Sequence, residues 1–560
     1  MCNKSLYLKY TIVIYVFAIF QHFTFAQNTI GLIESDQSLL YDGYTLLYPN
    51  FQSNIYLINN CGQVVHEWIN NEDYIPYGSA YLLENGNIVY TKYEQIPFTN
   101  FFNTFDPNTR YIDMKDWEGN MIYSYQSKDD NILFHHDFYP MENGNLLIIA
   151  YEKLTFEEAI LFGRDSTLIP HDTLWSDLII EVNPFEDTIV WKWHAKDHLI
   201  QNLDSTKNNY GELHENPGLI NINNLSFSER LDIMHLNSID YNPTLDQILV
   251  SSPYYNEIWI IDHSTTSNEA SEHTGGNSNK GGDLIYRWGN SKNYSSKEVT
   301  TQFLFFQHNA RWINKDSNAQ NSSFCDISIF NNRVENSYSA GLIIRPEFDF
   351  GSWEYKVDDN IFLPNDIKFQ ITHPIEENIY SRTISSFQVL SDENYLILDG
   401  DDGTIYELTS DQSIIFKYII PFNQGMPLTQ GDQVENIKNN TFSIKKYPAE
   451  YGAFDNKNLS SIGYLELEPN ESFCSLISVN SSNPIDDDII LFPNPARDFI
   501  YLNKSISEVN QIQIINLYSQ QINFSIIENR ISLEGFFPGF YVVTIVSENG
   551  KNYSQNFLVH

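Results

Sequence analysis

The chain has 560 residues, of which 42% are hydrophobic, so it can bury a large core and hold more than one domain. Its formal net charge of −40 at pH 7 argues against nucleic acid and anionic membranes as partners, because both would repel it. For the same reason an anionic substrate would need a local group of His, Arg or Lys side chains in a cleft.

Residues 1–26 have the pattern of a secretory signal peptide. Lys4 and Lys9 form a weakly basic start, residues 11–25 form an apolar core, and Thr24-Phe25-Ala26 fits a cleavage site. The apolar core is short for a spanning helix, so we expect it to be removed. No other segment is long and apolar enough to cross a membrane. We therefore predict export through the periplasm, with no transmembrane segment.

Three cysteines follow the signal sequence, at Cys61, Cys325 and Cys474. An odd number permits at most one disulfide and leaves at least one free thiol. The sequence does not decide which pair forms, and three buried reduced cysteines remain an alternative.

Residues 27–474 repeat one pattern of strands. An apolar strand, a turn of the Asn-Gly-Asn kind and a second apolar strand recur at residues 81–90, 141–149 and 389–398, and residues 244–250 fit the same hairpin with a longer turn. Helical periodicity is scarce, and aromatic and β-branched residues dominate, which is typical of an all-β protein. The expected outer strands of each repeat are residues 119–125, 188–193, 283–288 and 413–418.

Four-stranded sheets that recur along the chain in this way predict a β-propeller. We expect the inner strands to begin near Gly78, His136, His235, His308 and Ser386. A sixth copy begins near Gln433 and runs into residues 439–444 without outer strands, whereas residues 55–68 supply outer strands without an inner one. Joining these two segments closes a ring of six blades and removes two exposed sheet edges.

Three histidines occupy equivalent positions in this repeat. His136 precedes the turn residue Asn143 by seven positions, and Gly78 and Ser386 precede their own turns by the same number. We place His235 and His308 at the equivalent position of the next two blades. Since inner strands line the channel of a propeller, the three imidazoles should converge near one end of it.

Three kinds of site fit such a cluster. Histidines can transfer a group by nucleophilic attack, with neighbours that donate protons or hold developing negative charge. They can also bind zinc or copper, although no His-x-His pair or neighbouring carboxylate supports that here. The third alternative is three structural histidines with no joint role.

Several strings resemble the bacterial arylsulfate sulfotransferases. They are residues 135–145, 235–241, 256–266, 275–278, 281–289 and 307–312, within a region from about Tyr44 to Phe454. The resemblance implies a six-bladed propeller that moves a sulfuryl group from a phenolic sulfate to a phenol. It also implies a ping-pong reaction through a sulfated histidine, with no cofactor and no metal.

Carried over residue by residue, the resemblance makes His308 the nucleophile and has His136 assist at the bridging oxygen. His235 and Asn237 would hold the sulfuryl oxygens, and His135 and Arg311 are further candidates for substrate binding. The sulfate-clamping arginine of the family falls at Pro253, and a short disulfide loop near the nucleophile is missing. Arg287, Arg311 or Arg345 could replace this arginine from elsewhere in the fold.

The C-terminal region has a different composition. Residues 475–488 are polar, include Ser-Ser-Asn-Pro and Asp-Asp-Asp, and are expected to be a linker. Residues 489–560 predict a small β-sandwich that resembles the sorting domain of the type IX secretion system, with Phe492-Pro493-Asn494-Pro495 near its start and Pro538-Gly539-Phe540-Tyr541 near its end. This resemblance implies type IX machinery as a partner.

The sequence therefore predicts a secreted or surface-attached sulfotransferase-like enzyme that acts on a phenolic sulfate donor and a phenolic acceptor. The absence of an arginine at Pro253 also supports an alternative function, a non-catalytic surface propeller that binds aryl sulfates or other ligands.

Overall fold

The structure is a computed structural model, and its contacts divide the chain into two compact units, residues 1–478 and 479–560. The predicted signal peptide and linker lie outside the described residues. The structure describes residues 28–559 except 71–73, 95–110, 130, 170–172, 225–230, 297–300, 316–324, 391–393, 433–436, 475–490, 493–495, 497–498, 503–508, 517–519, 528–529, 534, 538 and 548–551.

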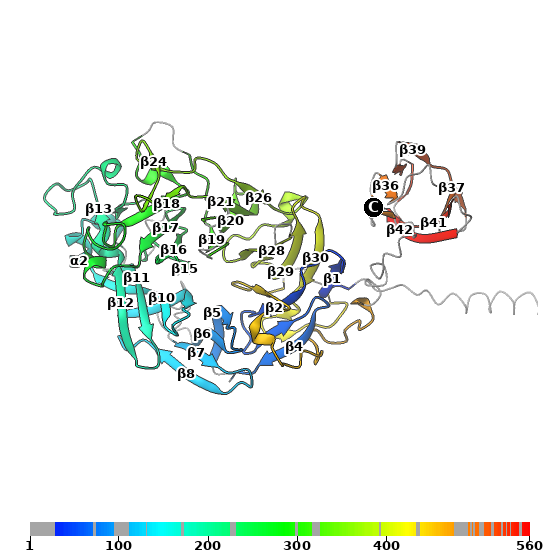
Figure 1. The fold of residues 1–560 in the computed structure, drawn as a ribbon, viewed down its shortest axis with the longest axis horizontal. Coiled ribbons are helices and arrows are strands. Elements are labelled where there is room, and N and C mark those ends of the chain that lie inside the picture. The colour runs from blue at the N-terminus through cyan, green and yellow to red at the C-terminus, as the bar shows by residue number, and fades with distance from the viewer. Residues whose placement is uncertain are drawn as a thin grey trace, which may run out of the picture. The chain divides into compact units, whose positions relative to one another are not determined.

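Within the described part of the first unit, six antiparallel sheets have four or five strands each, and they follow one another around a common centre (Figure 1). In sheet order from the innermost strand, they are β5 (Tyr74–Leu82), β6 (Ile88–Glu94), β7 (Tyr111–Lys115) and β8 (Met121–Gln126); β9 (Ile132–Pro140), β10 (Leu146–Thr155), β11 (Thr173–Asn183) and β12 (Thr188–His194); β15 (Ser238–Asn242), β16 (Gln247–Ser252), β17 (Glu257–Asp262) and β18 (Leu284–Trp288); β19 (His308–Trp312), β20 (Ile327–Val334), β21 (Tyr338–Ile344) and β26 (Phe369–Ile371); β27 (Ser386–Val389), β28 (Asn394–Asp399), β29 (Thr404–Thr409), β30 (Ile414–Ile419) and β1 (Gly31–Ser35); and β33 (Lys445–Pro448), β2 (Gly43–Leu47), β3 (Ile55–Ile58), β4 (Gln63–Trp68) and β34 (Gly463–Tyr464).

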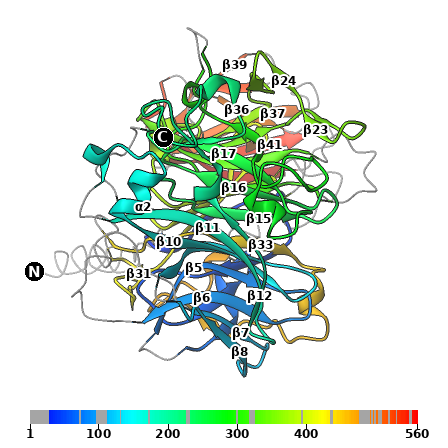
Figure 2. The same ribbon diagram turned by 90° about the vertical axis from the view of Figure 1, so that its left-hand side faces the viewer.

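The first strands of these sheets are neighbours in turn. β5 packs on β9, β9 on β15, β15 on β19 and β19 on β27. Gln388 of β27 exchanges two hydrogen bonds with the Lys446 backbone of β33, and the Tyr447 hydroxyl of β33 accepts from the Leu82 N–H of β5. Figure 2 shows the sheets of β5–β8 and β9–β12 side by side. The fold is an all-β propeller, as predicted, and the count of six blades stays our interpretation of this sheet order.

Two of the sheets combine strands from distant parts of the chain. The expected pairing of residues 55–68 with a late segment is present, because β2 pairs with β33 and carries β3 and β4 behind it. The inner strand is residues 445–448, however, and not residues 439–444, which make only an isolated bridge through Thr441. The strand repeat in the sequence did not predict β1, which adds a fifth strand beside β30.

Short elements fill the connections between the sheets. The helices are α2 (Phe156–Leu161) and the 3-10 turns η2 (Ser166–Leu168), η4 (Ala195–His198), η5 (Leu213–Glu215), η6 (Glu269–Ser271), η7 (Ser291–Asn293), η8 (Glu376–Asn378) and η9 (Gly452–Phe454). The two-stranded pairs are β13 (Leu199–Ile200) with β14 (Ile220–Asn221), β22 (Phe348–Asp349) with β23 (Glu354–Tyr355), β24 (Val357–Asp358) with β25 (Ile361–Phe362), and β31 (Phe422–Asn423) with β32 (Met426–Pro427).

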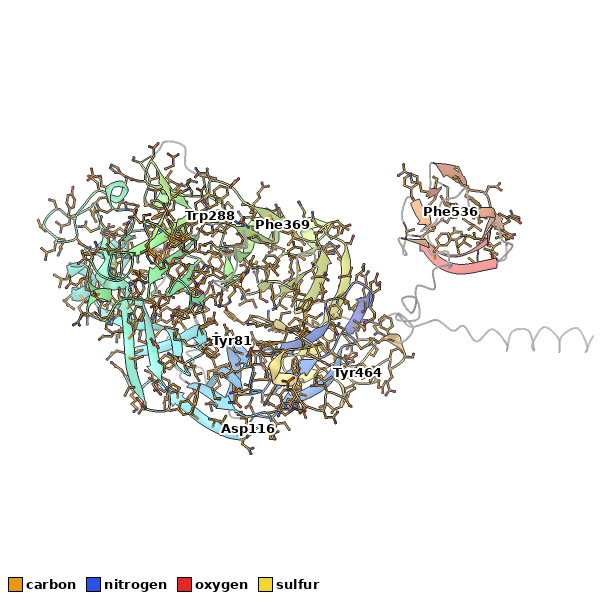
Figure 3. The ribbon with its side chains drawn as sticks, in the orientation of Figure 1. Tyr81, Asp116, Trp288, Phe369, Tyr464 and Phe536 are labelled. Atoms are coloured by element: carbon orange, nitrogen blue, oxygen red, sulfur yellow. A yellow bond between two sulfur atoms is a disulfide. The ribbon has the colours of Figure 1, made fainter. Side chains whose placement is uncertain are left out.

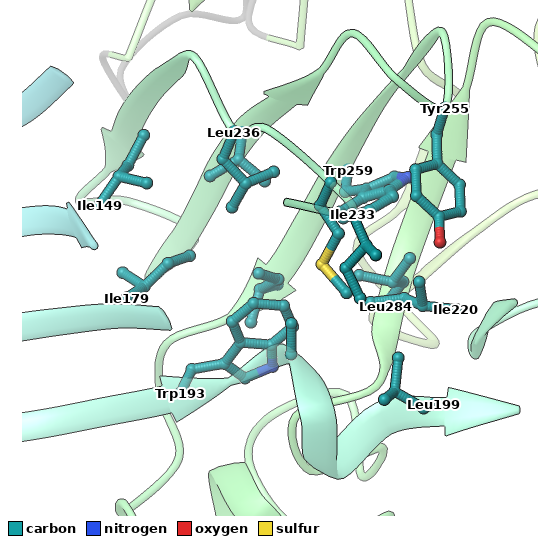
Figure 4. Close-up of a cluster of buried hydrophobic side chains, with 14 of the residues drawn as sticks. Ile149, Ile179, Trp193, Leu199, Ile220, Ile233, Leu236, Tyr255, Trp259 and Leu284 are labelled. Carbon is teal, nitrogen blue, oxygen red and sulfur yellow. The ribbon is translucent and has the colours of Figure 1, made fainter. Parts of the chain in front are cut away.

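The hydrophobic core lies between neighbouring sheets. Figure 4 shows one such cluster, in which Ile149 and Trp193 from one sheet meet Leu236, Trp259 and their neighbours from the next. Each fully buried large apolar side chain stabilises the fold by about 1.5–3 kcal/mol relative to exposure. Near the middle of the ring lies Tyr81, whereas Asp116 lies at its periphery (Figure 3). The core thus holds the inner strands in fixed positions.

Cys61 and Cys474 form a disulfide across 413 positions of the sequence, and Cys325 is a free thiol. The disulfide joins the turn between β3 and β4 to the segment that follows the last strand of the propeller. It therefore fastens the sheet in which early and late parts of the chain meet.

The second unit is a small β-sandwich. One sheet contains β35 (Leu491–Phe492), β36 (Phe499–Leu502), β40 (Arg530–Ser532) and β39 (Ser525–Ile527), and the other contains β38 (Gln521–Ile522), β37 (Val509–Asn516), β41 (Gly539–Ser547) and β42 (Asn552–Val559). Buried residues such as Ile500, Ile514 and Val543 form its own core.

Loss of the Cys61–Cys474 disulfide should destabilise the propeller. We expect Cys61→Ser to lower the free energy of unfolding by about 2–5 kcal/mol, because the unfolded chain regains the entropy of a long loop. All nine tryptophans lie in the propeller, so tryptophan fluorescence during guanidinium unfolding reports on that unit. Cys325→Ser is the control and should change the value by less than about 1 kcal/mol. Equal effects of the two substitutions would contradict this account.

Candidate functional site

The inner strands bend where the predicted histidines lie. His136 and His235 have left-handed backbone conformations, with φ of 53° and 59°, as does Gly78 in the equivalent position. The pairing of β9 with β10 and of β19 with β20 shifts register beside His136 and His308. Such bulges turn a side chain out of the regular alternation of a strand, and left-handed backbone costs energy in residues other than glycine. His136 and His235 thus lie in strained backbone at the predicted site.

The structure brings the three histidines together. The rings of His136 and His235 lie 4.6 Å apart between centroids, edge to face. Phe442 lies next to the cluster, with its ring 5.9 Å from that of His136 and 6.4 Å from that of His308. The side chains of His136 and His308 are both almost completely buried. The prediction of convergence from adjacent sheets is therefore correct.

Hydrogen bonds select the tautomer of His308. Its Nδ1 lies 2.8 Å from Asn332 Oδ1 and 3.2 Å from the Phe306 carbonyl oxygen, and both are acceptors. The Asn332 amide is itself oriented, because its Nδ2 donates to the carbonyls of Ser381 and Ile384. Nδ1 therefore carries the proton, and the lone pair of Nε2 accepts from the Ile384 N–H at 3.2 Å.

Burial keeps His308 neutral. The pKa of His308 is lowered to about 3, mainly by removal from water and also by the charges of His235 and Arg333, whereas the hydrogen bonds to Asn332 and Phe306 act in the opposite direction. A neutral imidazole with a fixed Nδ1–H presents a nucleophilic Nε2 at neutral pH. His308 thus has the form that an attacking histidine needs.

His235 has a carboxylate partner. Its Nδ1 lies 2.5 Å from Asp232 Oδ2, and the Tyr151 hydroxyl donates to the same oxygen at 3.1 Å. Burial raises the pKa of Asp232, but the charge of His235 and the hydrogen bonds from His235 and Tyr151 together outweigh burial and leave that pKa lowered. The ring of His235 also stacks on Tyr254 at 4.5 Å. An imidazole held against a carboxylate in this way can carry positive charge and donate from Nε2.

His136 is supported by His135. The Nδ1 atoms of the two rings are 2.8 Å apart, and His135 Nε2 lies 3.2 Å from Asp177 Oδ1. Burial lowers the pKa of His136 well below its usual range, and the neighbouring histidines, first His235, lower it further. His135 itself is buried and stacks on Tyr151 with ring centroids 3.5 Å apart. This geometry makes His135 a positioning residue for His136, while its predicted contact with substrate stays a prediction.

Asn237 also has a structural partner. Its Nδ2 donates at 2.8 Å to the carbonyl of Gln307, the residue before His308. The side chain is completely buried, and its Oδ1 is a buried acceptor. Asn237 thereby fixes the start of β19, and its predicted hydrogen bond to the sulfuryl group stays a prediction.

Arg311 belongs to a different part of the channel. It donates to Asp137 Oδ2 at 2.6 Å, to the Tyr81 hydroxyl at 3.1 Å and to the Ile239 carbonyl. It lines a cavity of about 270 Å³ that lies further along the inner strands than the histidines. Its predicted role in substrate binding therefore stays a prediction, with the guanidinium engaged by Asp137.

The other two arginines offered as replacements are also ion-paired. Arg287 is completely buried and donates to Glu257 at 2.7 and 2.9 Å. Arg345 binds both carboxylate oxygens of Asp326, at 2.6 and 2.8 Å. Neither has a contact with the three histidines among the hydrogen bonds and ring contacts of the described residues.

A cation that the sequence analysis did not name lies beside His308. Arg333 follows Asn332 in β20, and its guanidinium carbon lies 3.8 Å from the centre of the Phe306 ring. The Phe306 ring is 6.1 Å from that of His308 and 6.0 Å from that of Tyr254, the residue after Pro253. The neighbouring sheet thus brings the positive charge of Arg333 next to the turn that contains Pro253 and has no arginine.

A propeller with a buried nucleophilic histidine beside a carboxylate-paired one defines a class of site suited to group transfer on an anion. The chain matches the Arylsulfotransferase (ASST) family over residues 22–420 and belongs to it. This membership indicates an arylsulfotransferase-like function with phenolic substrates. Residues 490–560 match the secretion system C-terminal sorting domain, which indicates export by type IX machinery to the cell surface or the outside.

Solved structures resemble the chain only distantly. The periplasmic gluconolactonase PpgL of Pseudomonas aeruginosa is 8% identical, with a TM-score of 0.33, over 68% of this chain and 83% of that one. A chain of a nidogen/laminin complex is 6% identical, with a TM-score of 0.32, over 72% and 97%. A search of curated proteins found no match. Among the described residues, no helix has the length and apolar character needed to span a membrane.

The neutral His308 should make the fold sensitive to acid. In the unfolded chain a histidine has a pKa near 6.5, so below that pH the unfolded state binds a proton that the native state does not. Stability is therefore fully present above pH 6.5 and falls as the pH is lowered towards 3. At pH 5 the loss from His308 is about 2 kcal/mol relative to pH 7.5. Urea unfolding should show a smaller loss in His308→Gln, and an equal loss in both proteins would contradict the burial argument.

Proposed function

We propose that this protein is a secreted arylsulfotransferase that moves a sulfuryl group from a phenolic sulfate ester to a phenol through a sulfated His308. The observation that carries the proposal is the Nε2 lone pair of His308, fixed by the Asn332 amide and placed beside His136 and His235. Membership of the arylsulfotransferase family supports the reaction class.

In the first half-reaction, Nε2 of His308 loses its hydrogen bond from the Ile384 N–H, and its lone pair attacks the sulfur of the donor. The N–S bond forms as the S–O bond to the phenol breaks, and the electron pair of that bond leaves with the phenolic oxygen. The imidazole ring becomes positively charged, and Asn332 Oδ1 at Nδ1–H stabilises that charge. Donation from His235, supported by Asp232, balances the negative charge on the sulfuryl oxygens.

The phenolate must gain one proton as it leaves. We assign this proton to His136, which is neutral in the free protein and takes up a proton when an anionic donor enters the site. In the second half-reaction, the acceptor phenol gives its proton back to His136 and attacks the sulfur, which breaks the N–S bond. The two half-reactions together leave every residue in its starting state.

Arg333 supplies the positive charge that Pro253 cannot. Its guanidinium is stacked on Phe306 and held by an Nε–H bond of 2.8 Å to the Arg382 carbonyl, and its charge acts on His308. In a chain with a net charge of −40, such a local cation offsets repulsion of an anionic donor. Arg333 would therefore contact the sulfate end of the donor.

A covalent intermediate is the direct test. After exposure to 4-nitrophenyl sulfate without acceptor, intact-mass analysis should show the mass of one SO₃ group added to the full chain. We expect His308→Asn to abolish the adduct because it removes the attacking nitrogen. His214→Asn, at a histidine outside the cluster, is the control and should retain it. No adduct and no release of nitrophenol with any phenolic acceptor would contradict the proposed function.

Substitution of Arg333 tests the source of the positive charge. Arg333→Met should lower kcat/KM for aryl sulfates by about 10²-fold, since removal of one charge-stabilising donor has effects of this size. Arg382→Met is a matched control, because Arg382 is an exposed arginine whose side chain lies beside Asp401. It should stay within about threefold of the wild type. If Arg333→Met kept at least half of the wild-type value, Arg333 would have no role in binding the sulfate.

A further inference from the structure

A second cluster of histidines lies between two neighbouring sheets, away from the propeller centre. His198 ends η4, directly after β12, whereas His273 and Asp283 belong to the long loop between β17 and β18. This loop contains the pairs Gly275-Gly276 and Gly281-Gly282, and the proposed sulfuryl transfer makes no use of it.

The three side chains converge on one point. His198 Nδ1 and His273 Nδ1 each lie 2.8 Å from Asp283 Oδ1. The ligand atoms of all three residues lie within 4.8 Å of one another, and they are the one such group of three among the described residues. Two imidazole nitrogens and one carboxylate oxygen form a common ligand set for divalent transition metals.

The outer hydrogen bond of His198 fixes its tautomer. Nε2 lies 2.8 Å from the Ala270 carbonyl oxygen, which can only accept, so Nε2 carries a proton. In the neutral ring, Nδ1 then has a lone pair that faces a carboxylate oxygen at 2.8 Å. Two acceptors at this distance require a cation between them, either a proton or a metal ion. Metal-bound histidines have this outer bond to a carbonyl as a regular feature.

The ring of His198 is held rigidly from both sides. It is completely buried and stacks on Trp193, with ring centroids 5.6 Å apart and planes almost parallel. The Trp193 Nε1–H donates to the Gly282 carbonyl at 2.7 Å. A Cβ atom at Gly282 would lie 2.5 Å from His198 Nε2, so only glycine permits this approach. Figure 4 shows Trp193 at the boundary of the two sheets.

One side of the cluster is open. His273 and Asp283 line a cavity of about 440 Å³, and the His273 side chain is 58% exposed. A metal ion bound by three protein ligands would keep a fourth position towards this cavity for water or another small ligand. The strongly negative chain also favours retention of a cation.

We propose that His198, His273 and Asp283 bind one divalent transition-metal ion that fastens the β17–β18 loop to the neighbouring sheet. A metal uses both neutral imidazoles and the carboxylate at once. In the proton alternative, His198 donates a proton to the Asp283 carboxylate and no ion is needed. The proposal is independent of the sulfuryl transfer at His308.

Equilibrium dialysis of the full chain against Zn²⁺ provides the test, with Co²⁺ as a coloured reporter of the ligands. We expect one ion per chain and a rise in the melting temperature. His273→Ala and Asp283→Asn should each weaken binding by at least about tenfold. His273 is exposed, so its removal should leave the metal-free protein folded.

His194→Ala is the matched control, because His194 lies beside one carboxylate, Glu152, at 3.0 Å but belongs to no group of three metal-ligating side chains among the described residues. This variant should bind Zn²⁺ as the wild type does. Absence of stoichiometric binding by the wild-type chain would overturn the proposal and favour the protonated pair. Wild-type affinity in both His273→Ala and Asp283→Asn would also overturn it, since the ion would then lie elsewhere.

Discussion

The carboxylate of Asp137 is the contact on which the centre of the propeller depends. It accepts hydrogen bonds from the Tyr81 hydroxyl of β5, from the backbone of β9 and β15, and from Arg311 of β19. Four inner strands therefore meet at one buried carboxylate, next in sequence to His136. A charge in this position is stable only if it is fully bonded, so the spacing of the strands is tightly fixed. The strained backbone of the histidines is held in place by this network.

Burial and a neighbouring carboxylate give the three histidines of the site different properties. His308 and His136 are kept neutral by removal from water, whereas His235 lies against Asp232. One cluster thus holds both a neutral imidazole with a lone pair and an imidazole paired with a carboxylate, which three equivalent imidazoles in water could not do. At Asp283 and His198, the imidazole nitrogen faces a carboxylate oxygen, an arrangement suited to holding an ion.

The sequence predicted what depends on local periodicity. Hairpin repeats located most strands, a constant distance to the turn located His136, and the order of the blades located His235 and His308. Local periodicity did not predict strands β1 and β33, because their pairing joins segments hundreds of positions apart. Asn332 and Arg333 were missed since their roles depend on contacts with residues 24 and more positions away. The pairing of Asp232 with His235 could have been predicted from the sequence, because Asp232 precedes His235 by only three residues. The disulfide was undetermined by counting alone.

The pairing of β2 with β33 has a consequence for the order in which the molecule is made. β2 leaves the ribosome, and later the export channel, about 400 residues before the strand that completes its sheet. Until Lys445–Pro448 arrives, the ring has an open seam, and contacts of such long range form slowly. The ring therefore cannot close before this last strand is available. A chain cut before Lys445 would keep two unprotected sheet edges and would tend to associate with other copies through them.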